Sequence, residues 1–378
     1  MMYNFIVKTK STGGIMKFNI KRELLANTLS DFTLILKENP IKPILAGLKI
    51  EVKEGKITFI GTNLESSLIK TVEGKITEEG TVIVKPQLIL EYVKLLEIET
   101  IEIASDESSL KVHQAEFIIL NEEGYPKVKE LLPIEITKTN KDLLINGLEK
   151  CRFSAHPLPE NLALNCIRIL FKNKYTEFVS TDSYRLTYLK EKIPCIMEKE
   201  FSVPLESVNA ASKLLKEVNS DVTIGFSDNM LILLWEGSYF STRTVDLPFP
   251  DFKGILSYNG FDKTMEFNTN EFKSALKKVM TVAKTSYETK YGAVFEFKNK
   301  TLVIKTYSGK GKITQKVNML KEGEDFRGSL NTKFMLEFLN NITENVIVRG
   351  TNASSMFEIS EYGNENYKYI LMPLALRN

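Results

Sequence analysis

The chain has few of the residues on which most catalytic and metal sites depend. It contains only two histidines, His113 and His156, and three cysteines, Cys151, Cys166 and Cys195. The cysteines are odd in number and lack metal-type spacing, which is typical of free thiols in a reducing compartment. No GxxxxGK[S/T] motif occurs, and no GxGxxG follows a predicted strand. The sequence therefore predicts no metal, no cofactor and no catalytic residues.

Long apolar runs are missing as well. No stretch approaches the roughly 18 residues that a membrane helix needs, so we expect no membrane partner and a cytoplasmic location. Residues 1–15 carry one short apolar patch around Phe5, which is too short for a signal peptide. Met16 opens a better amphipathic pattern. Residues 1–15 are therefore interpreted as an N-terminal extension or a misassigned start.

What the chain does have is length and repetition. It has 378 residues, of which 43% are apolar and 26% are charged, values typical of a soluble globular protein with two or three domains. A short alternating strand ends near a threonine three times, about 120 residues apart. These stretches are KITFIGTN from Lys56, YTEFVSTD from Tyr175 and TLVIKTYS from Thr301, with Thr62, Thr181 and Thr306 at their ends.

Amphipathic helices repeat in step with these strands. One helix opens each repeat, and a second follows a strand and a start signal such as Pro86, Pro204 or the Asn331-Thr332 pair. The predicted fold class is α+β, with three repeated domains of two helices on an antiparallel sheet each. The predicted domains are 16–135, 136–258 and 259–378, and the predicted helices are 19–37, 85–96, 137–152, 204–217, 268–285 and 331–340.

Three such units suggest a ring. Sheets that continue edge to edge leave no exposed edge only if the array closes, which places the helices inside. With helices roughly 10 Å apart, one chain of six helices leaves a bore of about 9 Å, and two chains leave about 28 Å. A DNA duplex roughly 20 Å across passes only the second opening. Three repeats therefore favour a closed dimer around duplex DNA.

Charge favours the same arrangement. The six helix windows together carry a net charge of +7, whereas the rest of the chain carries −5. This bias suits phosphate attraction without sequence preference. The alternative is that the helices simply carry solvated lysines. The basic residues assigned to the DNA lining are Arg22, Lys141, Lys213, Lys216, Lys273, Lys277 and Lys278.

Five stretches resemble a known family, the bacterial DNA polymerase III beta subunit or sliding clamp. They are MKFNIKRELLANTL from Met16, KPILAGLKIEV from Lys42, STDSYRL from Ser180, FPDF from Phe249 and the terminal YILMPLALRN. The similarity runs in order from about Met16 to Arg377. It implies the DNA-clamp fold and a head-to-tail dimeric ring without catalytic activity. It also implies a replicative polymerase catalytic subunit, a clamp loader and other proteins with a clamp-binding motif as partners.

The resemblance implies one apolar groove for partner peptides, in which the apolar C-terminal tail forms a wall. A peptide with leucine or phenylalanine anchors needs a desolvated pocket with polar groups at its rim, which Arg185 and Ser355 could supply. The alternative is that the apolar residues are plain core. The groove residues implied are Leu164, Thr181, Ser183, Tyr184, Arg185, Leu186, Pro250, Ile255, Ser355, Ile370, Leu371, Met372, Pro373 and Leu374.

The resemblance also places the dimer interface, with Phe117 and Ile119 facing Val282 of a second copy. Two departures affect the groove. Ser183 and Tyr184 stand where the family has Gly-His, so the larger tyrosine side chain is expected to narrow the pocket or to change its floor. The terminal arginine, Arg377, lies two places later than in the family, which leaves its docking role open.

Three alternatives remain at this point. One is a peptide-binding ring scaffold that never meets DNA, and the helix charge bias disfavours it. Another is an enzyme that uses Asp182 and Arg185 as an acid–base pair, although such an enzyme would gain nothing from the threefold repeat. The third is a two-domain, trimeric ring, which three repeats in one chain disfavour.

Overall fold

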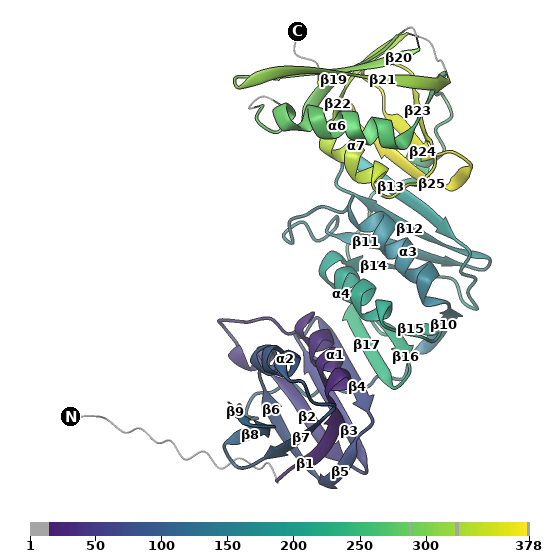
Figure 1. The fold of residues 1–378 in the computed structure, drawn as a ribbon. Helices are drawn as coiled ribbons and strands as arrows, with labels where there is room; N and C mark the ends of the chain where they lie inside the picture. Colours follow the sequence, from purple (N-terminus) through teal and green to yellow (C-terminus); the bar gives the residue numbers. More distant parts are fainter. Residues whose placement is uncertain (1–14, 287–288, 299, 322–324, 376–378) are drawn as a thin grey trace. The chain divides into compact units, whose positions relative to one another are not determined.

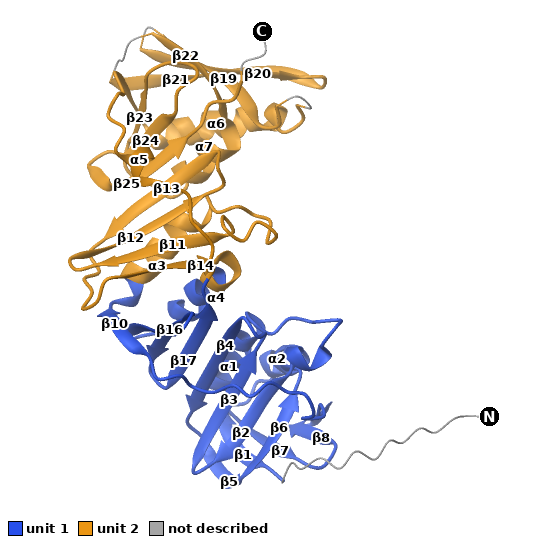
Figure 2. Ribbon diagram, turned by 180° about the vertical axis from the view of Figure 1, so that it is seen from behind, with its two compact units in different colours: residues 1–142, 209–244 blue, residues 143–208, 245–378 orange. Residues whose placement is uncertain are grey.

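The computed structural model describes residues 15–286, 289–298, 300–321 and 325–375. The chain folds into two compact units, residues 1–142 with 209–244 (unit 1) and residues 143–208 with 245–378 (unit 2), as Figure 2 shows. The boundary between the units lies inside the second predicted repeat. Almost all of the proposed extension 1–15, and Arg377 in the tail, lie outside the described residues. No described helix is long and apolar enough to cross a membrane.

Unit 1 contains a five-stranded sheet, β5-β1-β7-β8-β9, and an eight-stranded sheet, β10-β15-β16-β17-β4-β3-β2-β6 (Figure 1). Neighbouring strands are antiparallel, as predicted. The strands are β1 (Lys17–Lys21), β2 (Leu48–Lys53), β3 (Lys56–Thr62), β4 (Ser66–Val72), β5 (Lys75–Glu78), β6 (Gly80–Val84), β7 (Thr100–Ser105), β8 (Ser109–Val112), β9 (Ala115–Ile118), β10 (Ile134–Thr139), β15 (Val222–Ser227), β16 (Met230–Trp235) and β17 (Ser238–Arg243).

Unit 2 contains a twelve-stranded antiparallel sheet in the order β14-β11-β12-β13-β25-β24-β23-β18-β21-β20-β19-β22. Its last strand in sequence, β25, lies in the middle of the sheet, so the tail is firmly tied to the core. The strands are β11 (Cys166–Lys172), β12 (Tyr175–Thr181), β13 (Arg185–Glu191), β14 (Lys199–Pro204), β18 (Lys263–Phe267), β19 (Gly292–Lys298), β20 (Thr301–Ser308), β21 (Gly311–Lys321), β22 (Phe326–Asn331), β23 (Val346–Gly350), β24 (Phe357–Glu361) and β25 (Asn364–Leu371).

All six predicted helices are present. Helix α1 packs against α2 in unit 1, and α6 packs against α7 in unit 2. Two short helical elements, η1 and α5, escaped the prediction because one turn carries no periodicity. The helical elements are α1 (Arg22–Thr33), η1 (Pro43–Ala46), α2 (Pro86–Leu95), α3 (Lys141–Arg152), α4 (Leu205–Lys216), α5 (Lys253–Leu256), α6 (Thr269–Ala283) and α7 (Thr332–Leu339).

The helix starts follow local chemistry. The Asn268 side chain accepts hydrogen bonds from the backbone N–H groups of Asn270 and Glu271, at 3.0 and 3.1 Å, and so caps α6. Asn331 caps α7 in the same way. Pro86 occupies the first position of α2, where its missing N–H leaves no hydrogen bond unmade. Of these, Pro86 and Asn331 were predicted from the sequence as start signals.

The repeats join edge to edge, as predicted. In unit 1, β17 of the second repeat pairs with β4 of the first, and in unit 2, β25 of the third repeat pairs with β13 of the second. The three threonines that marked the repeat, Thr62, Thr181 and Thr306, are buried and end or nearly end the equivalent strands β3, β12 and β20. Each unit therefore contains one junction between two repeats.

Candidate docking surface and basic helix faces

A rigid turn between β12 and β13 holds the residues Thr181 to Arg185. The Thr181 hydroxyl donates to the Arg185 carbonyl oxygen over 2.6 Å and accepts from the Ser183 N–H over 3.1 Å. The Asp182 carboxylate accepts from the backbone N–H groups of Tyr184 and Arg185. Ser183 adopts a left-handed conformation with φ of +75°, a region that glycine adopts more readily than other residues. The turn leaves the Tyr184 ring 66% exposed.

The C-terminal tail lies alongside this turn in two distinct states. Ile370 and Leu371 form the end of β25, pair with Leu186 and Arg185, and are almost fully buried. After the strand, the Met372 N–H donates to the Tyr184 carbonyl oxygen over 2.9 Å, and the Met372 side chain is 42% exposed. Pro373 and Leu374 are half-buried. In this structure, Met372 to Leu374 are therefore the part of the predicted wall that a peptide could touch directly.

The predicted groove leucines Leu164 and Leu186 are buried, as Ile370 and Leu371 are. Leu186 and Ile370 belong to one buried cluster with Leu170, Val179 and Phe252, and Leu164 is also buried. Four partly buried side chains that were not predicted to belong to the groove pack against this cluster: Tyr188, Phe249, Leu256 and Met356. Phe249 stood in the quoted FPDF stretch, so that motif was the signal that could have identified it.

The remaining predicted groove residues lie at the surface. Ile255 is on α5 and partly exposed, and Pro250 is exposed. Ser355 is half-buried in the loop before β24. We call the exposed and half-exposed residues of this region, Tyr184, Ile255, Met372, Pro373 and Leu374 with the partly buried Tyr188, Phe249, Leu256 and Met356, the tail surface.

Arg185 differs from the expectation of a polar group at the rim. Its side chain is only 7% exposed, and Nε donates to Asp182 over 2.9 Å while Nη2 donates to the Phe153 carbonyl oxygen over 2.6 Å. Nη1 pairs with Glu337 on α7, and the guanidinium carbon lies 3.9 Å from the Phe334 ring centre. Because the N–H groups of its guanidinium are hydrogen-bonded inside the protein, Arg185 stabilises the turn and is not available to bind a ligand.

The same contacts bear on an acid–base role for Asp182 and Arg185. Asp182 already accepts two backbone N–H groups and a guanidinium N–H, and it is buried. The pair is therefore a structural ion pair rather than an open proton-transfer pair. Within the described residues, no group of three or more histidine, cysteine or acidic side chains is placed to hold a metal ion.

A phenol within the tail surface stays neutral. Burial and the nearby Glu177 carboxylate, which accepts a hydrogen bond from the Tyr188 hydroxyl over 2.8 Å, raise the pKa of Tyr188.

A hollow of about 460 Å³ adjoins the region beyond Leu164, and the His156 N–H donates to the Leu164 carbonyl oxygen. Its lining is His156, Leu158, Glu160, Asn161, Leu162, Ala163 and Leu247.

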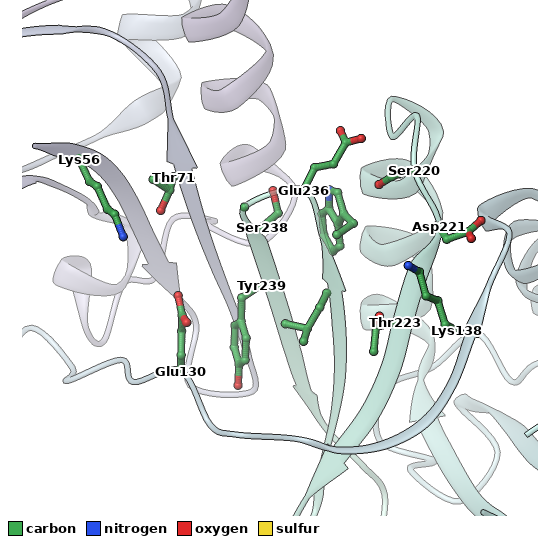
Figure 3. Close-up of a pocket in the computed structure, with 13 residues that line it drawn as sticks. Lys56, Thr71, Glu130, Lys138, Ser220, Asp221, Thr223, Glu236, Ser238 and Tyr239 are labelled. Atoms are coloured by element: carbon green, nitrogen blue, oxygen red, sulfur yellow. The ribbon is translucent and has the colours of Figure 1, made fainter. Parts of the chain in front are cut away.

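A hollow of about 660 Å³ in unit 1 is different in kind (Figure 3). None of the predicted docking residues lines it. The indole of Trp235 and the phenol of Tyr239 lie among charged groups of both signs, which does not match an apolar peptide groove. Those charged groups are Lys56, Lys138, Glu130, Asp221 and Glu236.

The basic residues assigned to the DNA lining fall on helices but differ in exposure. Lys213, Lys216, Lys277 and Lys278 are exposed, whereas Arg22, Lys141 and Lys273 are half-buried. The Lys273 ammonium donates to the Ile342 carbonyl oxygen over 3.2 Å, and burial together with the charge of Lys277 lowers its pKa. Lys277 and Lys278 are therefore the better candidates for phosphate contact on α6.

Two of the predicted interface residues lie at an edge strand, and the third, Val282, lies on α6. Phe117 lies on β9, the edge of the five-stranded sheet, and its ring lies 6.0 Å from that of Tyr92. Phe117, Ile119 and Val282 are half-buried. The most exposed apolar residue of this edge is Ile118, at 81%, which the prediction missed because alternation places it on the other face from Phe117.

These observations define an α+β architecture of three fused repeats, the DNA-clamp class of fold. The models for the N-terminal, central and C-terminal domains of the DNA polymerase III beta subunit match residues 16–129, 138–251 and 259–375. The chain belongs to the DNA polymerase III beta subunit family, that of the beta sliding clamps.

Individual relatives are similar over nearly their whole length. The beta sliding clamp of Staphylococcus epidermidis is 21% identical, covering 95% of this chain and 99% of that protein. That of Buchnera aphidicola is 24% identical, covering 95% and 100%. The crystal structure of the Thermotoga maritima DNA polymerase III beta subunit matches with a TM-score of 0.90 at 24% identity, covering 96% of this chain and all of that one. The fold expectation is thereby confirmed.

Proposed function

We propose that this protein is a DNA sliding clamp and processivity factor that acts as a closed head-to-tail homodimer in the cytoplasm. It encircles duplex DNA, is placed there by a clamp loader, and tethers the catalytic subunit of the replicative polymerase and other proteins that carry a clamp-binding peptide. It has no catalytic activity of its own. The observation that carries the proposal is the edge-to-edge fusion of three clamp repeats, within the predicted domains 16–135, 136–258 and 259–378.

Dimer closure is supported by two free sheet edges. β9 ends the five-stranded sheet of unit 1, and β21 takes in the third repeat the place that β4 and β13 take at the two junctions. Within the described part of the chain, residues 311–318 of β21 have no strand on the side away from β20. Unpaired edges are templates for pairing with another chain, so a head-to-tail contact between such edges would close a ring. The apolar residues Phe117, Ile118 and Ile119 at one edge fit this contact, with Val282 of a second copy opposite.

Sedimentation velocity tests the dimer. The Phe117→Ala/Ile119→Ala double variant is expected to sediment as a monomer, and Ile118→Ala is expected to weaken the dimer as well. The exposed Leu132→Ala, which lies outside the edge strand, is the matched control and should leave the dimer intact. A double variant that sediments like the unmodified protein would show that the interface lies elsewhere.

Duplex binding is tested by retention on circular DNA. Changing Lys273, Lys277 and Lys278 to alanine should shorten retention and reduce its salt dependence, because each lost phosphate contact removes about 0.9 from the slope of log K against log salt. Linear DNA, from which a ring slides off, is the control. A peptide-binding scaffold without a DNA role would be retained on neither substrate.

Partner docking is tested by removing the end of the tail. Deleting residues 372–378 removes the exposed part of the wall and the hydrogen bonds of Met372 and Leu374, but it leaves β25 intact. A fluorescent pentapeptide with leucine and phenylalanine anchors should lose most of its affinity in fluorescence polarisation, whereas the thermal melt and dimer persist. A collapsed melt would mean that these residues are chiefly core.

A further inference from the structure

The two sheet edges proposed to meet in the dimer carry charges of opposite sign. Residues 97–123, which include β9, contain eight acidic residues and one lysine. Residues 297–321, which include β21, contain seven lysines and no aspartate or glutamate. A head-to-tail contact therefore brings an acidic edge to a basic edge, whereas a contact between two copies of the same edge would oppose like charges.

The repeat itself gives the position of β21 in this contact. Four residues before α2, α4 and α7 begin, each repeat has a residue whose second neighbour across the sheet lies on the strand before the contact strand. These second neighbours are Phe59, Phe178 and Ile304. Three residues further on, the register leads to Ser67, Leu186 and Lys312. Lys312 of β21 therefore corresponds to Ser67 of β4 and Leu186 of β13.

The strands that meet these positions have an equivalent set of their own. Two residues before α1, α3 and α6 begin, each repeat pairs with the strand that follows its second helix, at Ile101, Val222 and Val346. Three residues beyond, the register leads across the next strand to Glu116, Ser241 and Ile370. The last two pair with Ser67 and Leu186 at the two junctions. By this equivalence, Glu116 of β9 lies opposite Lys312 of a second copy.

Glu116 and Lys312 are both available for such a pair. Their side chains are exposed, and among the residues that the structure describes neither has an ion-pair partner. On its other side, Glu116 lies opposite Lys111 of β8, so in the closed contact one carboxylate would lie between two ammonium groups. The same alternation is present in unit 2, where Glu358 pairs with a cation on each neighbouring strand, at 2.6 and 3.5 Å.

The apolar side of the contact fits the same register. One residue further along, Phe117 lies opposite Gly311, where an added Cβ atom would meet no atom within 4 Å. Phe117 and Ile313 alternate with the charged pair and are half-buried, so they lie on the other face, where the Phe117 ring lies beside Tyr92 of α2. An aromatic ring opposite a strand glycine covers its backbone. The contact therefore has an apolar face and a charged face.

Charge distinguishes this contact from the two junctions within the chain. At the equivalent position the first junction holds two serines, and the second holds Leu186 and Ile370 in a buried apolar cluster. Those junctions are joined through one continuous chain, so they need not separate. The contact between copies is the one that must open for a ring to be placed on DNA, and exposed charge pairs contribute little once salt screens them.

We infer that Glu116 of one copy pairs with Lys312 of the other at each contact of the ring. This pairing sets the head-to-tail direction and makes closure depend on salt. The inference rests on the proposed dimer, and it adds the groups that select the direction of the contact and control its opening.

Charge reversal tests the pair by fluorescence-detected sedimentation velocity of the full-length protein over a dilution series. Lys312→Glu and Glu116→Lys should each raise the dimer dissociation constant about tenfold or more at low salt, because each ring contains two such contacts and directly opposed like charges are destabilising. Between about 50 and 500 mM sodium chloride the dissociation constant of the unmodified protein should rise, whereas those of the variants should fall or stay level. Unchanged dimers in both variants would overturn the inference.

Mixing the two variants gives a sharper readout. In a mixed ring, one contact places Glu116 opposite Lys312 and the other places the two introduced residues opposite each other, so both contacts regain opposite charges. The mixture should therefore dimerise within about threefold of the unmodified affinity, as should the protein that carries both reversals. A mixture that stays as monomeric as its components would show that the two residues do not meet, and would overturn the inference.

Lys298→Glu is the matched control, because it makes the same charge change in the same basic stretch but lies on β19, two strands away from β21. It should leave the dissociation constant within about twofold, since exposed charges separated by more than about 8 Å are largely screened at physiological salt. A loss as large as that of Lys312→Glu would mean that net charge, and not the pair, weakens the dimer, and the inference would be wrong.

The dimer and the charge pair can fail separately. If Phe117→Ala/Ile119→Ala is a monomer while the charge reversals and their mixture behave as the unmodified protein does, the ring stands and the charge pairing is wrong. If the unmodified protein is a monomer at every concentration and salt, the proposed dimer is wrong as well.

Discussion

The two junctions between repeats share one backbone turn and differ in the side chains that they display. At the first junction Thr62 donates to the Ser66 carbonyl oxygen over 3.0 Å, and at the second Thr181 donates to that of Arg185 over 2.6 Å. The third residue of each turn, Leu64 or Ser183, is left-handed, with φ of +77° and +75°. The threefold sequence repeat is thus visible in individual hydrogen bonds.

The strand that joins each turn continues the parallel. The Arg243 N–H donates to the Glu65 carbonyl oxygen over 2.8 Å, and the Met372 N–H donates to that of Tyr184 over 2.9 Å. Glu65 and Arg243 form an exposed ion pair at 3.4 Å, whereas Tyr184 and Met372 present apolar surface. The same backbone arrangement therefore carries a polar surface at the first junction and an apolar surface at the second. The side chains alone determine at which junction a peptide can dock.

The largest expected effect is on the free energy of unfolding, and it comes from Arg185, whose side chain stabilises only the second turn. Arg185→Ala would leave the buried Asp182 carboxylate without its cation, and breaking a buried pair typically costs about 3–5 kcal/mol of unfolding free energy. The equivalent change at the first junction, Ser66→Ala, removes a neutral hydrogen bond to Thr242 and should cost only about 1 kcal/mol. Urea denaturation of both variants measures the difference.

Equal losses in the two variants would contradict this comparison. Arg185→Lys sharpens it, since an ammonium keeps the charge but cannot reach Asp182, Glu337 and the Phe153 carbonyl oxygen together. The free energy of unfolding of Arg185→Lys should lie between those of the unmodified protein and Arg185→Ala.

The next effect is on binding, and it comes from exchanging the two surfaces. Tyr184→Glu/Met372→Arg rebuilds the first junction's ion pair at the second. Peptide affinity measured by fluorescence polarisation should fall by about 2 kcal/mol or more, because anchor contacts at a docking site contribute on that scale. Both side chains are exposed, so the melt should hardly change.

The reverse exchange, Glu65→Tyr/Arg243→Met, is the matched control. It should leave affinity at the second junction unchanged, since it alters only the first. If instead the Tyr184→Glu/Met372→Arg protein binds the peptide normally, docking does not involve the tail surface.

The comparison also shows what a sequence can and cannot specify. Helix starts at Asn268, Asn331 and Pro86 were predictable because capping and proline chemistry act within a few residues. The burial of Arg185 was not, because its partner Glu337 lies 152 residues further along the chain. Short-range patterns also could not separate Ile370, which is core, from Met372, which is exposed, since both are apolar.

The smallest expected effect concerns the left-handed residues. A left-handed conformation costs a non-glycine residue about 1–2 kcal/mol, whereas glycine costs about 0.4–1 kcal/mol through the greater freedom of the unfolded chain. Leu64→Gly should therefore raise the free energy of unfolding by about 0.5 kcal/mol, and Ser183→Gly by less, because a bulky side chain disfavours this region more than serine does. Leu64→Ala, which keeps the Cβ atom and hence the strain, reports the loss of the leucine side chain alone. Urea denaturation in which both glycine variants are less stable than the unmodified protein would show that the turns hold these conformations without strain.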